Sequence, residues 1–312
     1  MRPTALCMIA SALLCAFQTA PAQAQPTRVF VAAQGLDGNA CTFAAPCRTF
    51  QRAHDAVAAN GEIDVLDPAG YGPLTITKAI SIQGHGFSGI SFPNFGAGIT
   101  ISAGASDLVS LRGLILDGVA TGQIGVLFNS GGTLDIEDCV IRNFSAGVYY
   151  KPSGSSAIIV SNTRLIGNHN NGILIDLTAA TTVSGTLDRV SMEGATSMIG
   201  SGLTIMAIAS AGSGAGTFTV SDSVISNNRF GIDAEATTGS VALMIRNSTV
   251  SNNSNLGVIS LGGGCKVWIT RSTIMGNGTG LSSNAGQLIS YGDNNVDGNS
   301  TDGAPTSTIP LK

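Results

Sequence analysis

Charged residues are scarce in this chain, at 11% of its 312 residues, and aromatic residues make up only 5%, with a single tryptophan at Trp268. The formal net charge is −4, and no segment is a run of basic residues. Nucleic-acid-binding proteins gather Lys and Arg, so we expect no nucleic-acid partner. Beyond residue 25, no apolar run approaches the roughly 18 residues that a membrane-spanning helix needs, so no transmembrane segment is expected.

The longest apolar run lies at the N-terminus, from Ala5 to Phe17. Arg2 precedes this run, and Ala22-Gln23-Ala24 follows it as a cleavage motif of small residues. This arrangement predicts a signal peptide over residues 1–25, cleaved after Ala24. We therefore expect a secreted, periplasmic or cell-surface protein, whose mature charge of −5 follows from −4 by the loss of Arg2.

A nine-residue pattern recurs eight times between Leu111 and Asn299, at steps of 22 to 33 residues. It reads apolar, any, bend residue, small residue, any, apolar, any, and then two positions rich in Gly and Asn. VSDSVISNN and IRNSTVSNN, which begin at Val220 and Ile245, are two of the copies. Repeats of this length indicate a solenoid, in which each unit buries its apolar face by stacking on its neighbours.

A second motif, Gly followed by alternating apolar residues, lies between the copies and is typical of a half-buried strand. It begins at Gly125, Gly147, Gly172, Gly202, Gly231 and Gly257. We expect three strands per turn. Strand A follows the Gly, strand B ends at the first apolar residue of the copy, and the short strand C follows the bend.

The bend position holds Gly, Asn or Asp in six of eight copies, which are the residues that best tolerate positive φ. Its occupants are Gly113, Asp138, Asn162, Arg189, Asp222, Asn247, Arg271 and Asp293. This backbone demand explains most of the repeated Asp and Asn, and we assign no metal ligands. The turns Asn227-Asn228 and Asn252-Asn253 are expected to stack their amides in ladders.

Four of the six cysteines lie beyond the signal peptide. Cys41 and Cys47 lie six residues apart in the loop CTFAAPC, and we expect them to pair in an oxidising compartment. Cys139 and Cys265 lie five repeats apart, about 24 Å at 4.8 Å per stacked strand, which is too far for a disulfide. Cys139 fills the small-residue position, so a buried thiol is expected.

Residues 28–100 form an N-terminal block ahead of the repeats. Arg28 to Ala32 is predicted as a strand, and Thr49 could cap a helix that runs to Ala59. The helix would cover the open first turn, because solenoids need capped ends. His54 lies on its apolar face and is expected to be a hydrogen-bonded core residue.

The repeats and the block VFVAAQGLDGNACTFAAPCRTFQRAHDAV resemble the secreted bacterial right-handed parallel β-helix proteins of the pectin lyase-like superfamily. The resemblance covers essentially the whole mature chain. It implies an all-β, single-stranded right-handed parallel β-helix with a short N-terminal helical cap. We divide the chain into the signal peptide at 1–25, the cap and first turns at 26–100, and the repeats with a C-terminal tail at 101–312. The superfamily includes lyases, hydrolases, epimerases and proteins with no known reaction, so the fold does not define an activity.

Enzymes of this superfamily usually bind glycans on strand A, where Asp233 and Glu235 are expected to point outward about 7 Å apart. Such a pair could act as acid and base on a glycosidic bond or hold Ca²⁺. A lyase needs a basic residue, for which Arg229 and Lys151 are the local candidates. A solvated surface without a catalytic role explains the same two acids.

Trp268 on strand B and Tyr149 on strand A are the candidate glycan-binding residues, because aromatic faces present a flat apolar surface to sugars. A loop or the tail after Thr306 could instead cover Trp268. We prefer a secreted, non-catalytic module associated with a glycan or a cell surface, with no cofactor. The alternatives are a polysaccharide lyase or glycoside hydrolase, with or without Ca²⁺, and a rigid structural spacer. The sequence does not define the oligomeric state.

Overall fold

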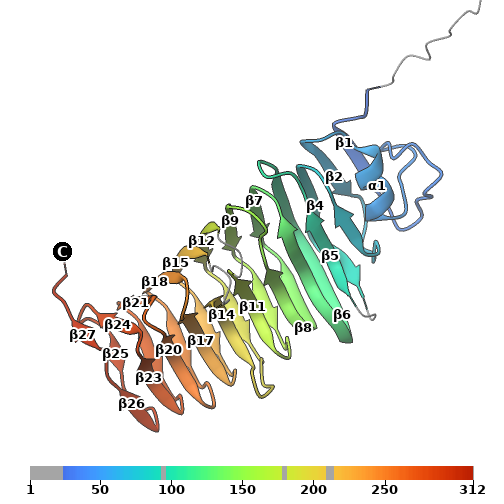
Figure 1. Cartoon of the computed structure of the whole chain (residues 1–312). Helices are drawn as coiled ribbons and strands as arrows, with labels where there is room; N and C mark the ends of the chain where they lie inside the picture. The colour runs from blue at the N-terminus through green and yellow to red at the C-terminus, as the bar shows by residue number, and fades with distance from the viewer. Residues whose placement is uncertain (1–23, 93–95, 178–180, 209–213, 312) are drawn as a thin grey trace, which may run out of the picture.

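The computed structural model describes residues 24–92, 96–177, 181–208 and 214–311. These residues form an elongated parallel β-solenoid of about nine turns, as expected from the repeats (Figure 1). The expected signal peptide lies outside the described residues, apart from Ala24 and Gln25. No helix among the described residues is long and apolar enough to cross a membrane.

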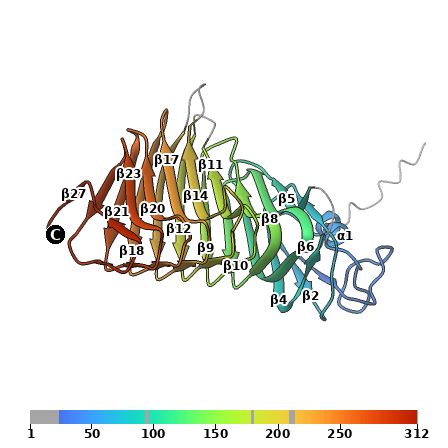
Figure 2. The same cartoon turned by 90° about the horizontal axis from the view of Figure 1, so that it is seen from below.

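Three parallel stacks of strands run along the solenoid (Figures 1 and 2). The strand B stack is β1 (Arg28–Val31), β2 (Gly61–Val65), β4 (Ile80–Ser91), β6 (Leu108–Ser130), β7 (Thr133–Glu137), β9 (Ser156–Ser161), β12 (Thr182–Asp188), β15 (Ala215–Ser221), β18 (Ser240–Arg246), β21 (Cys265–Thr270), β24 (Gln287–Ser290) and β27 (Ser307–Thr308).

The strand A stack faces another side of the solenoid. It consists of β3 (Leu74–Ile76), β5 (Ala97–Ser102), the end of β6, β8 (Val140–Tyr150), β11 (Asn171–Asp176), β14 (Ser201–Ala207), β17 (Phe230–Ala236), β20 (Leu256–Leu261), β23 (Thr279–Asn284) and β26 (Thr301–Gly303).

The strand C stack is the shortest. It contains parts of β4, β6 and β8, followed by β10 (Arg164–Ile166), β13 (Ser191–Glu193), β16 (Val224–Ser226), β19 (Thr249–Ser251), β22 (Thr273–Met275) and β25 (Asn295–Val296). The order of strands within each turn therefore confirms the order expected from the sequence.

Positive φ at the bend between strands B and C confirms the backbone demand predicted there. It holds at seven of the eight bend positions, including Arg189 at 52° and Arg271 at 46°. The prediction for the last copy is wrong, because Gly292, at 80°, takes the positive φ there and Asp293 does not. In this copy Asn294, rather than a serine, follows Asp293. Its Oδ1 accepts a hydrogen bond from the Ser272 amide at 2.9 Å.

The solenoid core contains a hydrogen-bonded series of side chains that we call the asparagine ladder, formed by Asn228, Asn253, Asn277 and Asn299. The backbone N–H of each of the first three donates to Oδ1 of the next, at 3.1, 3.0 and 2.9 Å. Each Nδ2 also donates to the Oδ1 of the following asparagine and to a backbone carbonyl of an earlier turn. Asp302 ends the series, because its Oδ1 accepts from the backbone N–H and the Nδ2 of Asn299.

The predicted asparagine stacking is therefore confirmed for only the second residue of each Asn-Asn pair. Asn227 and Asn252 are exposed and adopt positive φ, at 57° and 54°. They form the turn itself, whereas their buried neighbours supply the ladder.

The N-terminal helix α1 (Phe50–Ala56) is shorter than predicted. Thr49 caps it by accepting a hydrogen bond from the Arg52 amide at 3.2 Å, but Val57 is already extended, so the helix ends at Ala56 and not at Ala59. The prediction for His54 is confirmed. It is buried, its Nε2 accepts from the Thr77 amide at 3.2 Å, and its Nδ1 donates to Asp55 at 3.1 Å.

A disulfide joins Cys41 to Cys47, as expected, within the block that contains α1. Cys139 and Cys265 are free and fully buried in the core. Burial raises the pKa of Cys139 to about 12. These two thiols are therefore core groups.

Candidate functional site

The strand A face consists of the outward side chains of β6, β8, β11, β14, β17 and β20, which the strand register aligns in two columns. The first column is Leu127, Tyr149, Leu174, Thr204, Asp233 and Ile259. The second includes Asp176, Met206, Glu235 and Leu261. The face is therefore largely apolar, with separate acidic positions.

Asp233 and Glu235 lie together on β17, as predicted, and both are partly exposed. Oδ1 of Asp233 is buried and has no hydrogen-bond partner. The pKa of Asp233 is raised to about 6, first by burial and then by the charge of Glu235. This carboxyl group exchanges its proton at mildly acidic pH, which is a property that a general acid needs.

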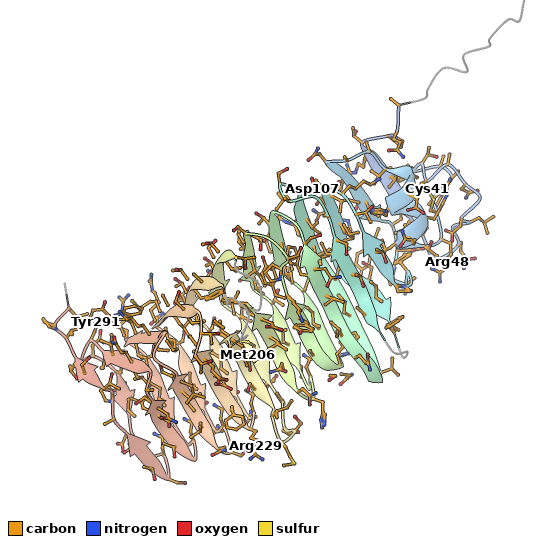
Figure 3. The ribbon with its side chains drawn as sticks, in the orientation of Figure 1. Cys41, Arg48, Asp107, Met206, Arg229 and Tyr291 are labelled. Atoms are coloured by element: carbon orange, nitrogen blue, oxygen red, sulfur yellow. A yellow bond between two sulfur atoms is a disulfide. The ribbon has the colours of Figure 1, made fainter. Side chains whose placement is uncertain are left out.

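The structure does not bring Lys151 to these acids. Its Nζ lies 3.8 Å from Oδ2 of Asp176, and three strand spacings, about 14 Å, separate its position from that of Glu235. Arg229 lies in the turn before β17, with its guanidinium group 5.4 Å from the centre of the Phe230 ring (Figure 3). Among the described residues, no Lys, Arg or His nitrogen lies within 4.0 Å of a carboxylate oxygen of Asp233 or Glu235.

Tyr149 exposes only part of its ring on the strand A face. Its ring is half-buried between Leu127 and Leu174 of the adjacent strands. Its hydroxyl group donates to Oδ2 of Asp176 at 3.0 Å. Burial, followed by this hydrogen bond, raises the pKa of Tyr149 to about 12, so the phenol stays neutral. Tyr149 therefore positions Asp176 and leaves little free ring surface.

Trp268 points outward on β21 beside Met244 of β18, as predicted, and is partly exposed. The C-terminal tail does not pair with β21. It forms β27, which pairs with β24 one turn further on. Trp268 therefore keeps part of its surface free at the C-terminal end of the strand B stack.

A groove of about 510 Å³ lies beside Trp268, and we call it the strand B groove. It is lined by Thr219, Met244, Arg246, Thr270, Arg271, Tyr291, Asp293 and Leu311. Figure 3 shows Tyr291 near the C-terminal end of the molecule. The contributions of Arg246, Arg271 and Tyr291 were not predicted from the sequence, although the alternation along β18 places Arg246 on the same face as Met244.

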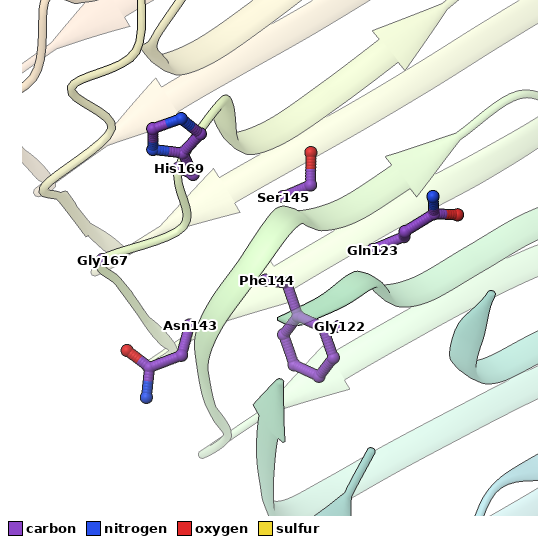
Figure 4. A pocket seen from close by; sticks show the side chains of 7 residues that line it. All are labelled: Gly122, Gln123, Asn143, Phe144, Ser145, Gly167 and His169. Atoms are coloured by element: carbon purple, nitrogen blue, oxygen red, sulfur yellow. The ribbon is translucent and has the colours of Figure 1, made fainter. Parts of the chain in front are cut away.

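A second hollow, of about 470 Å³, lies at the turns that lead into strand A and was not predicted (Figure 4). The exposed Gln123, Asn143 and His169 surround the buried Phe144. It forms where the pairing of β6 with β8 shifts between Asp117 and Gly122, an irregularity that the repeat pattern does not reveal. Its polar rim lacks an exposed aromatic ring.

Among residues 24–92, 96–177, 181–208 and 214–311, no group of three or more His, Cys, Asp or Glu side chains is arranged to hold a metal ion. Charged side chains of the solenoid instead form pairs across adjacent turns. Arg112 contacts Glu137 at 2.7 Å and Arg142 contacts Asp117 at 2.9 Å.

Comparison with protein-family models and with curated protein sequences gives no match. Among solved structures, the chain is similar to the crystal structure of pectate lyase Pel9A, with 18% sequence identity and a TM-score of 0.48 over 86% of this chain and 70% of that one. It is also similar to a rhamnogalacturonan lyase, with 10% identity and a TM-score of 0.30 over 84% of this chain and 75% of the other. These similarities concern the fold alone.

Proposed function

We propose that this protein is a secreted, non-catalytic module that binds a glycan in the strand B groove. The proposal depends on one observation. Partly exposed Met244, Trp268 and Tyr291 lie at the same end of one face, beside a groove large enough for one or two sugar rings. Sugars stack their apolar C–H faces on aromatic rings, while guanidinium groups donate to their oxygens.

The strand A face supports catalysis less well. Cleavage of a glycosidic bond requires an acid and a base on either side of the bond, or a base beside a sugar carboxylate. Asp233 and Glu235 are neighbours, but the two basic candidates are directed elsewhere, toward Asp176 and Phe230.

Secretion is part of the same proposal. The Cys41–Cys47 disulfide is typical of oxidising compartments, and the first 25 residues have the pattern of a signal peptide. N-terminal sequencing of exported protein tests this point. We expect the mature chain to begin at Gln25, and an intact Met1 would contradict the proposal.

The binding proposal is tested by titrating the protein with a panel of oligosaccharides and measuring the heat of binding. We expect Trp268→Ala to weaken binding about tenfold or more, because aromatic contacts contribute on the order of 1 kcal/mol beyond burial. Ile159→Ala is the matched control, since Ile159 is also an exposed apolar residue of the strand B stack. Equal affinities for Trp268→Ala and the parent protein would contradict the proposal.

A polysaccharide lyase or glycoside hydrolase is the second candidate, favoured by the raised pKa of Asp233. It is tested by measuring new reducing ends and unsaturated products from polysaccharides, with and without Ca²⁺. Cleavage that is lost in Asp233→Asn/Glu235→Gln would establish this function in place of the first. A protein that neither cleaves nor binds any glycan would instead be a structural spacer.

A further inference from the structure

Most lysine and arginine side chains in the described part of the chain are held by nearby groups of the protein itself. Arg229 is an exception, because its Nε is buried without a hydrogen-bond partner. The side chains that have a carboxylate oxygen within 4.0 Å are Arg28, Arg112, Arg142, Lys151, Arg164 and Arg189. Arg48, Arg52 and Lys78 donate to backbone carbonyls of the N-terminal block.

Arg246, Lys266 and Arg271 differ from this pattern. All three are exposed, and in the described part of the chain their side chains have no carboxylate within 4.0 Å and no hydrogen bond. Arg246 and Arg271 are close together, because Arg246 pairs with Thr270 of β21 and Arg271 occupies the bend that follows. Lys266 lies earlier on β21, about 13 Å along the strand from Thr270. An acidic protein thus keeps two free arginines side by side.

Two of these cations, Arg246 and Arg271, belong to the lining of the strand B groove, and Trp268 adjoins that lining through Met244. Arg246 follows Met244 by two residues on the same face, about 7 Å along β18, and Met244 pairs directly with Trp268. Arg246, Arg271 and Tyr291 all line the groove. A sugar ring that contacts Trp268 would therefore have guanidinium groups at its edge.

Asp293 is the one acidic side chain in the groove lining, and its carboxylate is already engaged. Oδ1 accepts from the Arg271 amide at 3.1 Å, and Oδ2 accepts from the Thr270 hydroxyl at 2.8 Å. The hydrogen bond from Thr270, followed by that from the backbone of Arg271, lowers the pKa of Asp293. Asp293 fixes the bend and forms no ion pair within 4.0 Å with either guanidinium group, although the charge of Arg271 also contributes to its lowered pKa. Two arginines and one aspartate leave the groove lining with a net positive charge.

We propose that the strand B groove selects an acidic saccharide, whose ring lies against Trp268 and Tyr291 and whose anionic substituent meets Arg246 and Arg271. The inference rests on the proposed function and adds the charge of the ligand to it. The planar guanidinium fork matches carboxylate, sulfate and phosphate oxygens, and two arginines beside one ring provide that match.

The test uses β-1,4-linked tetrasaccharides that share one backbone and differ only in charge. Cellotetraose is the neutral probe, and the corresponding glucuronate, sulfated and phosphorylated tetramers are the acidic probes, each titrated into the full chain at low and high salt. We expect at least one acidic tetramer to bind about tenfold more tightly than cellotetraose at low salt, with the difference shrinking as salt screens the charges. The three acidic probes distinguish carboxylate from sulfate and phosphate recognition.

Two variants separate charge selection from sugar binding. Arg246→Gln and Arg271→Asn should lower the affinity for the acidic tetramer far more than the affinity for cellotetraose, and so remove most of the preference for the acidic tetramer. Asparagine suits the second position because Asn247 occupies the same bend one turn earlier. Arg164→Gln, which removes an equal charge from a distant turn, is the control and should retain the preference.

The outcomes are distinguishable. Equal affinity for neutral and acidic tetramers, or a preference that survives both variants, would overturn the inference, while binding that depends on Trp268 would still support the proposed function. If none of the tetramers binds, this inference fails, and the proposed function is decided by the wider panel of oligosaccharides.

Discussion

At the scale of single residues, the buried asparagines hold the turns of the solenoid in register. Asn253 accepts hydrogen bonds from Asn228 and donates to the Ile225 carbonyl and to Asn277. Its side chain is fully buried, so water cannot replace these partners. Each such residue therefore satisfies polar groups of two turns at once.

Asn253→Ala should lower the free energy of unfolding by about 1–3 kcal/mol, because it leaves buried donors and acceptors without partners. Urea denaturation followed by circular dichroism provides the measurement. Ser254→Ala, at the exposed next position, is the control and should change stability by less than about 0.5 kcal/mol. Equal effects of the two substitutions would show that the ladder does not stabilise the fold.

Asp233 gives the protein a defined pH dependence. A carboxyl group whose pKa is higher in the folded state, here about 6, binds its proton more tightly when folded than when unfolded. The free energy of unfolding should therefore fall as pH rises from about 4 to about 6 and then level off. Asp233→Asn should remove this part of the pH dependence, as measured by denaturation at a series of pH values.

Glu235→Gln provides an internal check on that interpretation. It should lower the pKa of Asp233 in an NMR titration but leave it above the usual value, since burial is the larger cause. A pKa of Asp233 near 4 in the parent protein would contradict both expectations.

Residue-scale predictions from the sequence succeeded where the repeat itself makes the demand. Positive φ at the bends followed from Gly, Asn and Asp in a fixed position. The pairing of Lys151 with Asp176 follows from the same stacking, because adjacent turns bring the two side chains together. The free cations of the groove were missed because a charge is recognised as unpaired only when every neighbour is placed.

At the scale of elements, the glycine that precedes each strand A is required by the close approach of adjacent turns. A Cβ built on Gly231 would lie 2.4 Å from the Gly257 carbonyl oxygen and 2.6 Å from a methyl group of Val250. No side chain fits without moving the backbone of the next turn. The sequence motif of Gly followed by alternating apolar residues therefore indicates close packing of adjacent turns as well as the start of a strand.

Gly231→Ala should destabilise the protein by roughly 1–3 kcal/mol, the cost typical of overpacking a core. Gly263→Ala is the matched control, because a Cβ there would meet no atom within 4 Å. Thermal denaturation of the two variants measures the difference. A Tm for Gly231→Ala equal to that of the control would show that adjacent turns can separate at little cost.

The strands were more predictable than the ends of the elements. Alternating apolar residues defined strands A and B and their register, because a shift by one residue would expose the whole core. The helix was predicted three residues too long, since Ala58 and Ala59 favour a helix while the hydrogen bond from the Ala58 amide to the Pro26 carbonyl holds the chain in another path. Tertiary contacts outweigh propensity at such an end.

At the scale of the whole molecule, each turn contacts mainly its immediate neighbours, so stability is expected to be local along the axis. The N-terminal block that contains α1 and the Cys41–Cys47 disulfide covers the first turn. Damage to this block should loosen the turns beside it and spare those at the far end.

Cys41→Ser/Cys47→Ser tests this locality. Loss of the cross-link should destabilise the N-terminal block by about 2 kcal/mol, as the short loop that it closes suggests. Hydrogen exchange should accelerate in β1, α1 and β2 and remain unchanged in β18, β21 and β24. Uniform acceleration along the chain would indicate that the solenoid unfolds as a single cooperative unit.

The asparagine ladder also gives the solenoid an electrical direction. Each amide oxygen points toward the preceding turn and each Nδ2 toward the following one, so the side-chain dipoles align, with their positive ends toward the C-terminus. Asp302 places a carboxylate at that positive end, much as an acidic residue does at the N-terminus of an α-helix. The ladder thus resembles a capped helix in its aligned dipoles and terminal carboxylate, although side chains from separate turns form it.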